Sequence, residues 1–376
     1  MAIEIKEIKP TRREIKKFSL FSTNLYKDNA YYVPDLLMDN LDTFNPAKNP
    51  ASEFCDSKLF MAYRDGKAVG RVAGIINRVV NEKSNEKNVR FGFIDFVDDE
   101  EVSAALLGAV EDWGRSQGMD HIVGPLGFTD MDPEGMLVEG FDQLGTMATI
   151  YNHPYYPRHI EKLGFERDTD WVEFKIAIPE SIPDKMVRIC DIVKKKYNVR
   201  NIKYTSSKAL VKDYGQAIFR LINEAYSQLY GYSPLTPRQI DHYINMYLPV
   251  LRLENVSLIV DADNALIGVG IAMPSMSKAL QRSRGKLFPL GWYHLLKALK
   301  GKNDVVDLLL VAIKPEYQSK GVNSLLFNDL SPCFKKNGYT YAESNPELDD
   351  NQRVQLQWQY FDTTLHKRRR AYKKAL

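Results

Sequence analysis

The sequence predicts an α/β protein (α+β mixed sheet) built from two tandem domains, each a central mixed β-sheet flanked by helices. The chain has 376 residues, which is too long for one typical domain and sufficient for two with separate cores. The same order of predicted strands and helices occurs in both halves. A segment with two prolines, 179–184, separates a strand from a basic helix, as expected of a linker. We therefore predict domains at 1–180 and 181–376.

The composition excludes several classes of protein. Hydrophobic residues make up 44% and charged residues 26%, as in ordinary globular proteins, and a net charge of +3 is too small to indicate nucleic-acid binding. Cys55, Cys190 and Cys333 lack metal-ligand or disulfide-framework spacing, so we expect a reducing compartment and no metal. The amino terminus lacks an apolar signal segment, and the longest apolar run, 305–313, is too short to span a membrane. These observations predict a cytoplasmic protein.

In the amino-terminal half, residue periodicity predicts a strand, a helix, a hairpin, a strand and a second helix. Thr11 is placed to cap the first helix, and Asp65-Gly66 favours a hairpin turn. The second helix carries apolar residues on one face and stops at Gly118. The predicted ranges are 3–8, 11–28, 59–63, 68–76, 89–96 and 100–117.

The carboxy-terminal half repeats this order. A strand and a helix precede a hairpin over the turn 261–264, and an apolar strand, a helix and a last strand follow. The predicted ranges are 199–204, 214–230, 256–260, 266–273, 305–313, 318–336 and 339–343. The repetition indicates two copies of one architecture.

The most informative motif follows the strand 305–313. Pro315 stops that strand, and Gln318-Ser319-Lys320-Gly321-Val322-Asn323 leads into the next helix. A glycine-containing turn at a helix start directs unpaired N–H groups and the positive end of the helix dipole at one point. The spacing is neither G-x-x-x-x-G-K-[ST] nor G-x-G-x-x-G. The loop is therefore predicted to bind a diphosphate group.

Residues 311–326 resemble the V-x-V-x-P-x-x-Q/R-x-x-G-x-G/A-x-x-L-L pattern of the GNAT superfamily of N-acyltransferases. They are similar to it at every position except Asn323, where the family has Gly or Ala. The resemblance, to the tandem two-domain bacterial type, covers nearly the whole chain. It implies that the loop grips the pyrophosphate of coenzyme A. The Asn323 side chain would either crowd the phosphate or point away and donate to it.

The resemblance also implies roles for individual residues. The backbones of Val311, Ala312 and Ile313 would hold the pantetheine arm, and Asn351 would contact the coenzyme. The full set of implied coenzyme-binding residues is Val311, Ala312, Ile313, Gln318, Ser319, Lys320, Gly321, Val322, Asn323 and Asn351.

Acyl transfer to an amine also needs a base and an acid. Glu343, at the end of the next strand, is the candidate base. Tyr360 is the candidate acid, because the family's tyrosine would fall near Trp358. Glu343 is equally interpretable as a solvated or capping carboxylate, and Tyr360 as a packing residue.

The amino-terminal half resembles the same fold without the loop. At the equivalent position, Asp98-Asp99-Glu100-Glu101 suits a helix start but repels a diphosphate. Asn152 and the segment 160–165 are similar to later parts of the family pattern. We expect no coenzyme in this half, which would be structural or acceptor-binding. The segment 124–129, rich in glycine and proline, is either a wall of an acceptor pocket or a rigid connection.

Two basic segments bear on the substrate. Residues 277–300 mix Lys and Arg with Leu, Phe, Trp and Tyr, a composition that predicts peripheral membrane contact. The tail 366–374 carries six positive charges and suits an anionic partner. The alternatives are a helical lid over the active site and a basic final strand.

Together these features predict an acyl-CoA-dependent N-acyltransferase, similar to N-acetyltransferases. It would transfer an acyl group from acetyl-CoA or a longer acyl-CoA to a small-molecule or lipid amine, such as a sphingoid base. A catalytically silent binding or scaffold protein of the same fold is the alternative hypothesis, and a nucleic-acid partner is not expected. The acyl-chain length and the oligomeric state stay open.

Overall fold

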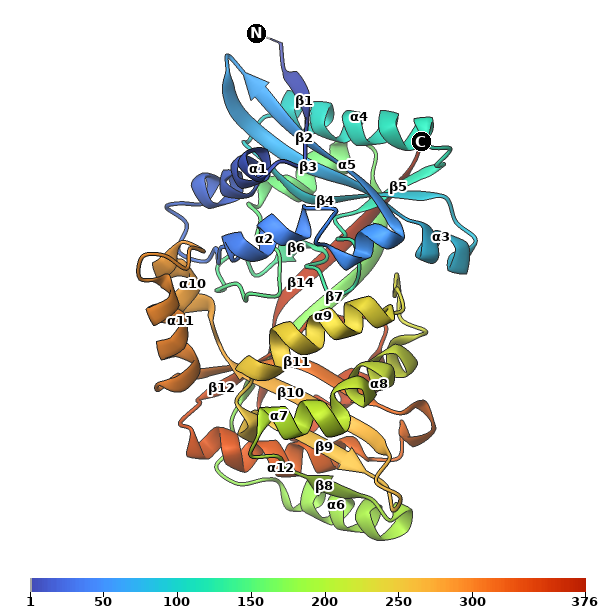
Figure 1. Cartoon of the computed structure of the whole chain (residues 1–376), viewed down its shortest axis with the longest axis vertical. Helices are drawn as coiled ribbons and strands as arrows, with labels where there is room; N and C mark the ends of the chain where they lie inside the picture. Colours follow the sequence, from blue (N-terminus) through green and yellow to red (C-terminus); the bar gives the residue numbers. More distant parts are fainter. Residues whose placement is uncertain (1) are drawn as a thin grey trace. The chain divides into compact units, whose positions relative to one another are not determined.

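The computed structural model describes residues 2–376, which form two compact units. Figure 1 labels most of their helices and strands. The amino unit contains the chain up to Val172 together with Met276–Leu295 and His366–Leu376. The carboxy unit contains Glu173–Ser275 and Leu296–Leu365. Each unit includes segments distant in sequence. A single domain boundary near residue 180 stays a prediction.

The amino unit is a mixed sheet with strands in the order β1-β2-β3-β4-β5-β14. Strands β1 to β4 are antiparallel neighbours, β4 and β5 run parallel, and β14 returns antiparallel to β5. Its elements are β1 (Glu4–Ile8), α1 (Arg12–Leu25), α2 (Leu37–Thr43), β2 (Cys55–Arg64), β3 (Lys67–Asn77), α3 (Arg78–Ser84), β4 (Asn88–Phe96), α4 (Glu100–Ser116), β5 (His121–Gly124), β6 (Met136–Glu139), α5 (Tyr155–Lys162), the start of β7 (Glu166–Ala177), α10 (Ser277–Ser283), the start of α11 (Gly291–Lys300) and the end of β14 (Thr363–Ala375).

The two faces of this sheet bury different helices, because side chains alternate along each strand. Phe60 and Ala62 of β2 pack in one core cluster with Leu106 of α4. Leu59 and Met61, which alternate with these two residues along β2, belong to another core cluster. That cluster includes Ile15 and Phe18 of α1. The sheet is therefore the middle layer between α1 and α4.

Local sequence signals start and stop these elements as predicted. The Thr11 hydroxyl accepts from the Glu14 N–H at the start of α1. Asp65 and Gly66 both have positive φ, 52° and 74°, which is the backbone of a tight hairpin turn between β2 and β3. Asp99 caps α4 by accepting from the Glu101 N–H at 3.0 Å.

The carboxy unit has strands in the order β7-β12-β11-β10-β9-β8. Helices α6 and α12 share a core cluster with β9 and β10. Its elements are the end of β7, α6 (Asp184–Tyr197), β8 (Arg200–Ile202), α7 (Ser207–Leu210), α8 (Gln216–Tyr226), α9 (Pro237–Tyr247), β9 (Val256–Val260), β10 (Leu266–Pro274), the end of α11, β11 (Val305–Ile313), α12 (Asn323–Lys336), β12 (Tyr341–Ser344), β13 (Glu347–Leu348), α13 (Gln352–Gln355) and the start of β14.

The predicted fold class is confirmed, and the predicted strands at 256–260 and 305–313 agree with β9 and β11. The prediction that a helix begins at Gln318 is wrong. Gln318 is extended, and Ser319 and Gly321 have left-handed backbones with φ of 59° and 77°. A right-handed helix cannot pass through them, so α12 begins only at Asn323.

Candidate functional site

The loop between β11 and α12 gathers backbone donors at the start of a 14-residue helix. The left-handed residues Ser319 and Gly321 alternate with other conformations, an arrangement that turns successive N–H groups toward one side. Among the backbone hydrogen bonds that residues 2–376 form outside helices and strands, none is donated by the N–H groups of residues 319–322. Such donors, next to the positive end of a helix dipole, suit an anion.

The Gly321 position accepts only glycine without strain. Its φ of 77° disfavours any side chain, and an added Cβ would lie 3.1 Å from Ile189 Cγ2 and 3.4 Å from Val193 Cγ2 of α6. Lys320, within the loop, has its Nζ 5.3 Å from the centre of the Tyr197 ring and 5.7 Å from that of Tyr317. The loop thus carries one positive charge of its own.

The one departure from the family pattern, Asn323, has its side chain engaged elsewhere. Its Nδ2 donates to Oε1 of Gln357 at 3.3 Å, in the short helical turn Leu356–Tyr360. Of the two possibilities at this position, crowding the phosphate or pointing away, this contact fits the second.

Strand β11 loses one of its two neighbours halfway along. It pairs in parallel with β12 only from Val305 to Leu308, because β12 ends at Ser344. Its antiparallel pairing with β10 continues to Ile313, interrupted by a bulge at Leu309. Residues 309–313 therefore have an open edge, on the side where β12 would continue.

The hydrogen-bond pattern shows which backbone groups face this open edge. Lys314 N–H donates to the Ile267 carbonyl at 2.9 Å, which makes Ile313 and Gly268 a non-hydrogen-bonded pair. By alternation, the backbone groups of Ala312 face β10, and those of Val311 and Ile313 face away from it.

Side chains cap the carbonyls along this edge. Asn345 Nδ2 donates to the Leu309 carbonyl at 2.6 Å, the Tyr226 hydroxyl to that of Val311 at 2.9 Å, and Gln318 Nε2 to that of Ile313 at 3.0 Å. The N–H groups of Val311 and Ile313 lie on the same edge. They form a row that leads to the loop 318–323, which we call the anion loop. Of the three predicted backbone contacts, the structure thus places two on the edge, while Ala312 faces β10.

A carboxylic acid lies at the same end of the sheet. Glu347 follows β12 by three residues, and the Trp358 indole N–H donates to both of its oxygens, at 3.0 and 3.2 Å. Burial raises the pKa of Glu347 to about 8, although the Trp358 hydrogen bond lowers it. Burial, and also the charge of Glu347, raise the pKa of Tyr226 to about 12. A carboxyl group and a phenol hydroxyl, both with raised pKa values, thus lie near each other at this end of the sheet.

The remaining predicted residues lie elsewhere in the carboxy unit. Glu343 sits in the paired part of the sheet, opposite Asp307 of β11 and Lys175 of β7, and is 5% exposed. Tyr360 has the Lys185 Nζ 5.1 Å from its ring centre. Asn351 stands before α13, and its N–H donates to the Leu348 carbonyl at 3.0 Å. Their roles in catalysis and coenzyme binding stay predictions.

Sequence reasoning did not find Tyr226, Asn345 or Glu347 as functional residues. Tyr226 begins a run of three tyrosines in seven residues, 226–232, at the end of a predicted helix. Asn345 and Glu347 follow the strand in which Glu343 was chosen. The sequence signal that could have indicated them is a group of polar residues directly after a strand, in a loop.

In the amino unit, the equivalent gap is filled by the chain itself. β4 and β5 pair only from Asn88 to Arg90, and β4 also has a bulge, with Phe93 at a φ of 48°. The segment 124–128 then follows β4. Leu126 N–H donates to the Phe91 carbonyl, and Arg90 to the Gly127 carbonyl, both at 3.0 Å. Of the two interpretations of this segment, the contacts fit a rigid connection.

The acidic run of the amino unit is paired with nearby cations. Arg64 forms ion pairs with Asp99 and Glu101, and Lys162 with Glu100. His159, 6% exposed, lies 2.9 Å from Asp98. The run is a helix start, as predicted, and its Asp99, Glu100 and Glu101 carboxylates form ion pairs.

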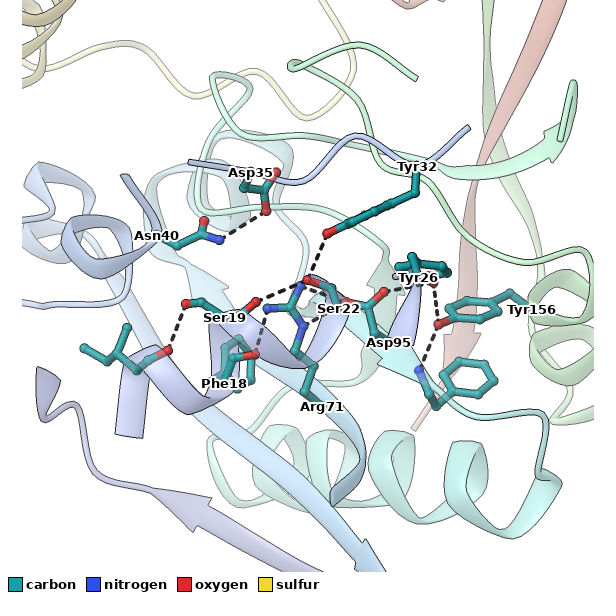
Figure 2. Close-up of polar contacts among 12 residues, drawn as sticks. Phe18, Ser19, Ser22, Tyr26, Tyr32, Asp35, Asn40, Arg71, Asp95 and Tyr156 are labelled. Atoms are coloured by element: carbon teal, nitrogen blue, oxygen red, sulfur yellow. Dashed lines mark hydrogen bonds and ion pairs between the residues drawn. The ribbon is translucent and has the colours of Figure 1, made fainter. Parts of the chain in front are cut away.

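Figure 2 shows a buried polar network in the amino unit that joins α1, β3, β4 and α5. The Arg71 guanidinium pairs with Asp95 at 2.7 and 2.8 Å and donates to the Phe18 carbonyl at 3.0 Å. The Tyr26 hydroxyl donates to the other Asp95 oxygen at 3.0 Å and lies 2.7 Å from the Tyr156 hydroxyl. Each charge has partners, as a stable buried pair requires.

The basic tail forms the end of β14 and is largely engaged within the amino unit. Lys367 and Arg369 are each 1% exposed, and Arg370 donates to Asp170 at 2.8 and 3.1 Å. The alternative of a basic final strand therefore describes this segment.

Residues 2–376 lack two particular kinds of site. No group of three or more His, Cys, Asp or Glu side chains there is arranged to hold a metal ion. None of the helices in this part of the chain combines the length and apolar character needed to cross a membrane.

The fold is that of tandem GNAT proteins. The chain superposes on a tandem GNAT protein from the clavulanic acid biosynthesis pathway with a TM-score of 0.57 at 10% identity, over 99% of this chain and 98% of the other. The fold implied by the sequence resemblance is thus confirmed. No protein-family model matches the sequence.

Two relatives extend along nearly the whole chain. Protein YghO of Escherichia coli (strain K12) is 26% identical over 371 residues, which cover 97% of this chain and 94% of the relative. The bacterial ceramide synthase of Caulobacter vibrioides (strain NA1000 / CB15N) is 25% identical over 375 residues, covering 97% of this chain and 96% of the relative.

Proposed function

We propose that the protein is an N-acyltransferase that uses acyl-CoA and acts in its carboxy unit. The observation that carries this proposal is the open edge of β11, which leads without interruption into the anion loop at 318–323. The edge offers the N–H group of Val311 to the thioester carbonyl and that of Ile313 to an amide of the pantetheine arm, and the loop offers donors to a diphosphate. This succession of groups matches the two parts of coenzyme A.

The chemistry requires a proton acceptor for the amine and a donor for the thiolate. In this proposal Glu347 takes the proton from the attacking amine nitrogen as the carbon–nitrogen bond forms. The backbone N–H of Val311 stabilises the negative charge on the thioester oxygen. The carbon–sulfur bond then breaks, and Tyr226 supplies the proton to sulfur. Glu343 as the base and Tyr360 as the acid are the alternatives predicted from the sequence. Substitutions at these four residues distinguish one pair from the other.

A long-chain amine is the proposed acceptor, with a small polar amine as the alternative. The relative named as a bacterial ceramide synthase supports the first, because a ceramide is the amide of a fatty acid and a sphingoid base. We infer accordingly that a long-chain acyl-CoA is the donor and that acetyl-CoA is the alternative.

Ligand binding tests the proposal before the acceptor is known. Thermal denaturation with palmitoyl-CoA or acetyl-CoA should show stabilisation by at least one, since a ligand that binds only the folded state raises its stability. Gly321→Val should abolish the shift. Gly338→Val is the matched control, because Gly338 has nearly the same φ, 76° against 77°, in the same unit and no neighbour within 4 Å of an added Cβ.

Turnover tests the reaction itself. Sphinganine with palmitoyl-CoA should release free coenzyme thiol and form an amide detectable by mass spectrometry. Absence of stabilisation by both thioesters would refute coenzyme binding. Stabilisation without turnover of any amine would favour the alternative, a catalytically silent binding protein.

A further inference from the structure

The segment 286–300 exposes large apolar side chains on the surface of the protein. The exposed fractions are 73% for Phe288, 62% for Leu290, 49% for Trp292 and 50% for Tyr293. Such residues are individually common on surfaces, but four within six positions form a patch that usually marks an interaction site.

Helix α11 places this patch on one face. At 100° per residue, Trp292, Leu296 and Lys300 follow one another at one-turn intervals, with Tyr293 and Lys297 beside them. All five are exposed, whereas Gly291 and Leu295 on the other side are buried. The outward face therefore combines two aromatic rings and a leucine with two lysines.

The charge around the patch has one sign. Residues 277–303 contain no Asp or Glu. Several exposed basic side chains there form no ion pair with any residue of the described chain: Arg282, Arg284, Lys286, Lys297, Lys300 and Lys302. An occupant of this surface must supply negative charge.

Hydrogen bonds fix the residues just before the segment, and its first part, within the amino unit. Gln281 Nε2 donates to the carbonyls of Ala30 and Tyr32, at 2.8 and 3.0 Å, and the Gly285 carbonyl accepts from Leu37 N–H at 2.8 Å. The Trp292 indole N–H donates to the Pro289 carbonyl at 3.1 Å. The exposed rings are thus presented by a fixed loop, which lowers the entropy cost of binding.

We propose that residues 286–300 form a docking surface for an anionic lipid bilayer. Trp and Tyr rings suit the boundary between head groups and acyl chains, and the surrounding Lys and Arg suit anionic head groups. A second copy of the chain fits poorly, because a two-fold contact would bring the same positive charges together. A protein partner fits less well, since lysine is depleted in interface cores. This proposal is independent of acyl transfer.

Vesicle co-sedimentation without acyl-CoA or amine tests it. The full chain should bind vesicles of equal parts phosphatidylcholine and phosphatidylglycerol, and bind phosphatidylcholine alone much less. Lys297→Gln/Lys300→Gln should weaken binding about 25-fold, at about fivefold for each lysine removed from an anionic surface. Phe288→Ala/Trp292→Ala should weaken it about tenfold or more. Matched controls are Lys16→Gln and Ile192→Ala, exposed residues of other helices.

Several results would overturn the proposal. One is the absence of wild-type binding to the anionic vesicles at low salt. Another is unchanged binding by either double variant. A third is self-association that depends on Trp292 in ultracentrifugation while vesicle binding is absent, which would assign the patch to a second copy. Because all positions are exposed, circular dichroism and thermal denaturation should confirm folding, and the lysine variant alone is a sufficient test.

Discussion

Replacing Glu347 with glutamine tests the proposed base. Glutamine keeps the shape and can still accept from the Trp358 indole N–H, but it cannot take a proton. A general base contributes about 10²- to 10⁴-fold to rate, so turnover should fall by that factor. Binding of palmitoyl-CoA, measured by thermal shift, should change little, because the proposed coenzyme contacts lie on the β11 edge and the loop.

The structure also sets the pH dependence. Only the deprotonated carboxylate accepts a proton, and the pKa of Glu347 is raised to about 8. At pH 7 about a tenth of the enzyme would be in the active form, so kcat should rise nearly tenfold per unit below pH 8 and level off above. Trp358→Phe removes a hydrogen bond to the charged form, worth about 1.5 kcal/mol, and should move the inflection up by about one unit.

Stability provides a readout independent of turnover. The pKa of Glu347 is higher in the folded chain than its ordinary value of 4.5, so the folded state gains from the protonated form and loses stability as pH rises from about 5 to 8. The melting temperature of Glu347→Gln should therefore rise relative to that of the wild type as the pH increases over that range. Glu343→Gln is the control. If Glu343→Gln abolishes turnover and Glu347→Gln keeps the pH inflection, the assignment of the base is wrong.

Three further predictions concern folding and the coenzyme loop. Asp95→Ala leaves the buried Arg71 charge unpaired and should lower the free energy of unfolding, measured by urea denaturation, by about 3–5 kcal/mol. Adding Arg71→Met to that variant should restore much of the lost stability. Equal losses for the single and the double variant would contradict this prediction. Gly92→Ala places a Cβ 2.2 Å from a backbone oxygen and should cost about 1–3 kcal/mol, whereas Gly108→Ala, in open space on a helix, should stabilise by about 0.5–1 kcal/mol. Gly321→Ala should weaken thioester binding with little change in the unliganded melting curve beyond about 1–2 kcal/mol, measured by calorimetry.

Much of the fold could be predicted because the signals are local. The apolar runs of β9 and β11, the Thr11 cap and the Asp65-Gly66 turn are each recognised from a few neighbouring residues. The start of α12 could not be read in this way. Left-handed Ser319 is a non-glycine residue in that conformation, which composition does not reveal.

The candidate site was predictable where it is made of backbone. The anion loop and the strand before it carry a pattern, whereas Tyr226 and Asn345 reach the open edge from segments 85 and 36 residues away in sequence. The raised pKa of Glu347 depends on burial beside Trp358, which follows from packing. Which of the nearby carboxylates is buried beside Trp358 is therefore decided by tertiary packing and not by local sequence.

The self-filled gap of the amino unit has a consequence for what could enter it. Gly92 leaves room for the backbone of Leu126, and Arg90 donates to the carbonyl of Gly127, so strand and segment are fitted to each other. Withdrawal of the segment would leave polar backbone groups without partners, which costs free energy. Any ligand of this gap would therefore have to displace a piece of the protein's own backbone and replace its hydrogen bonds.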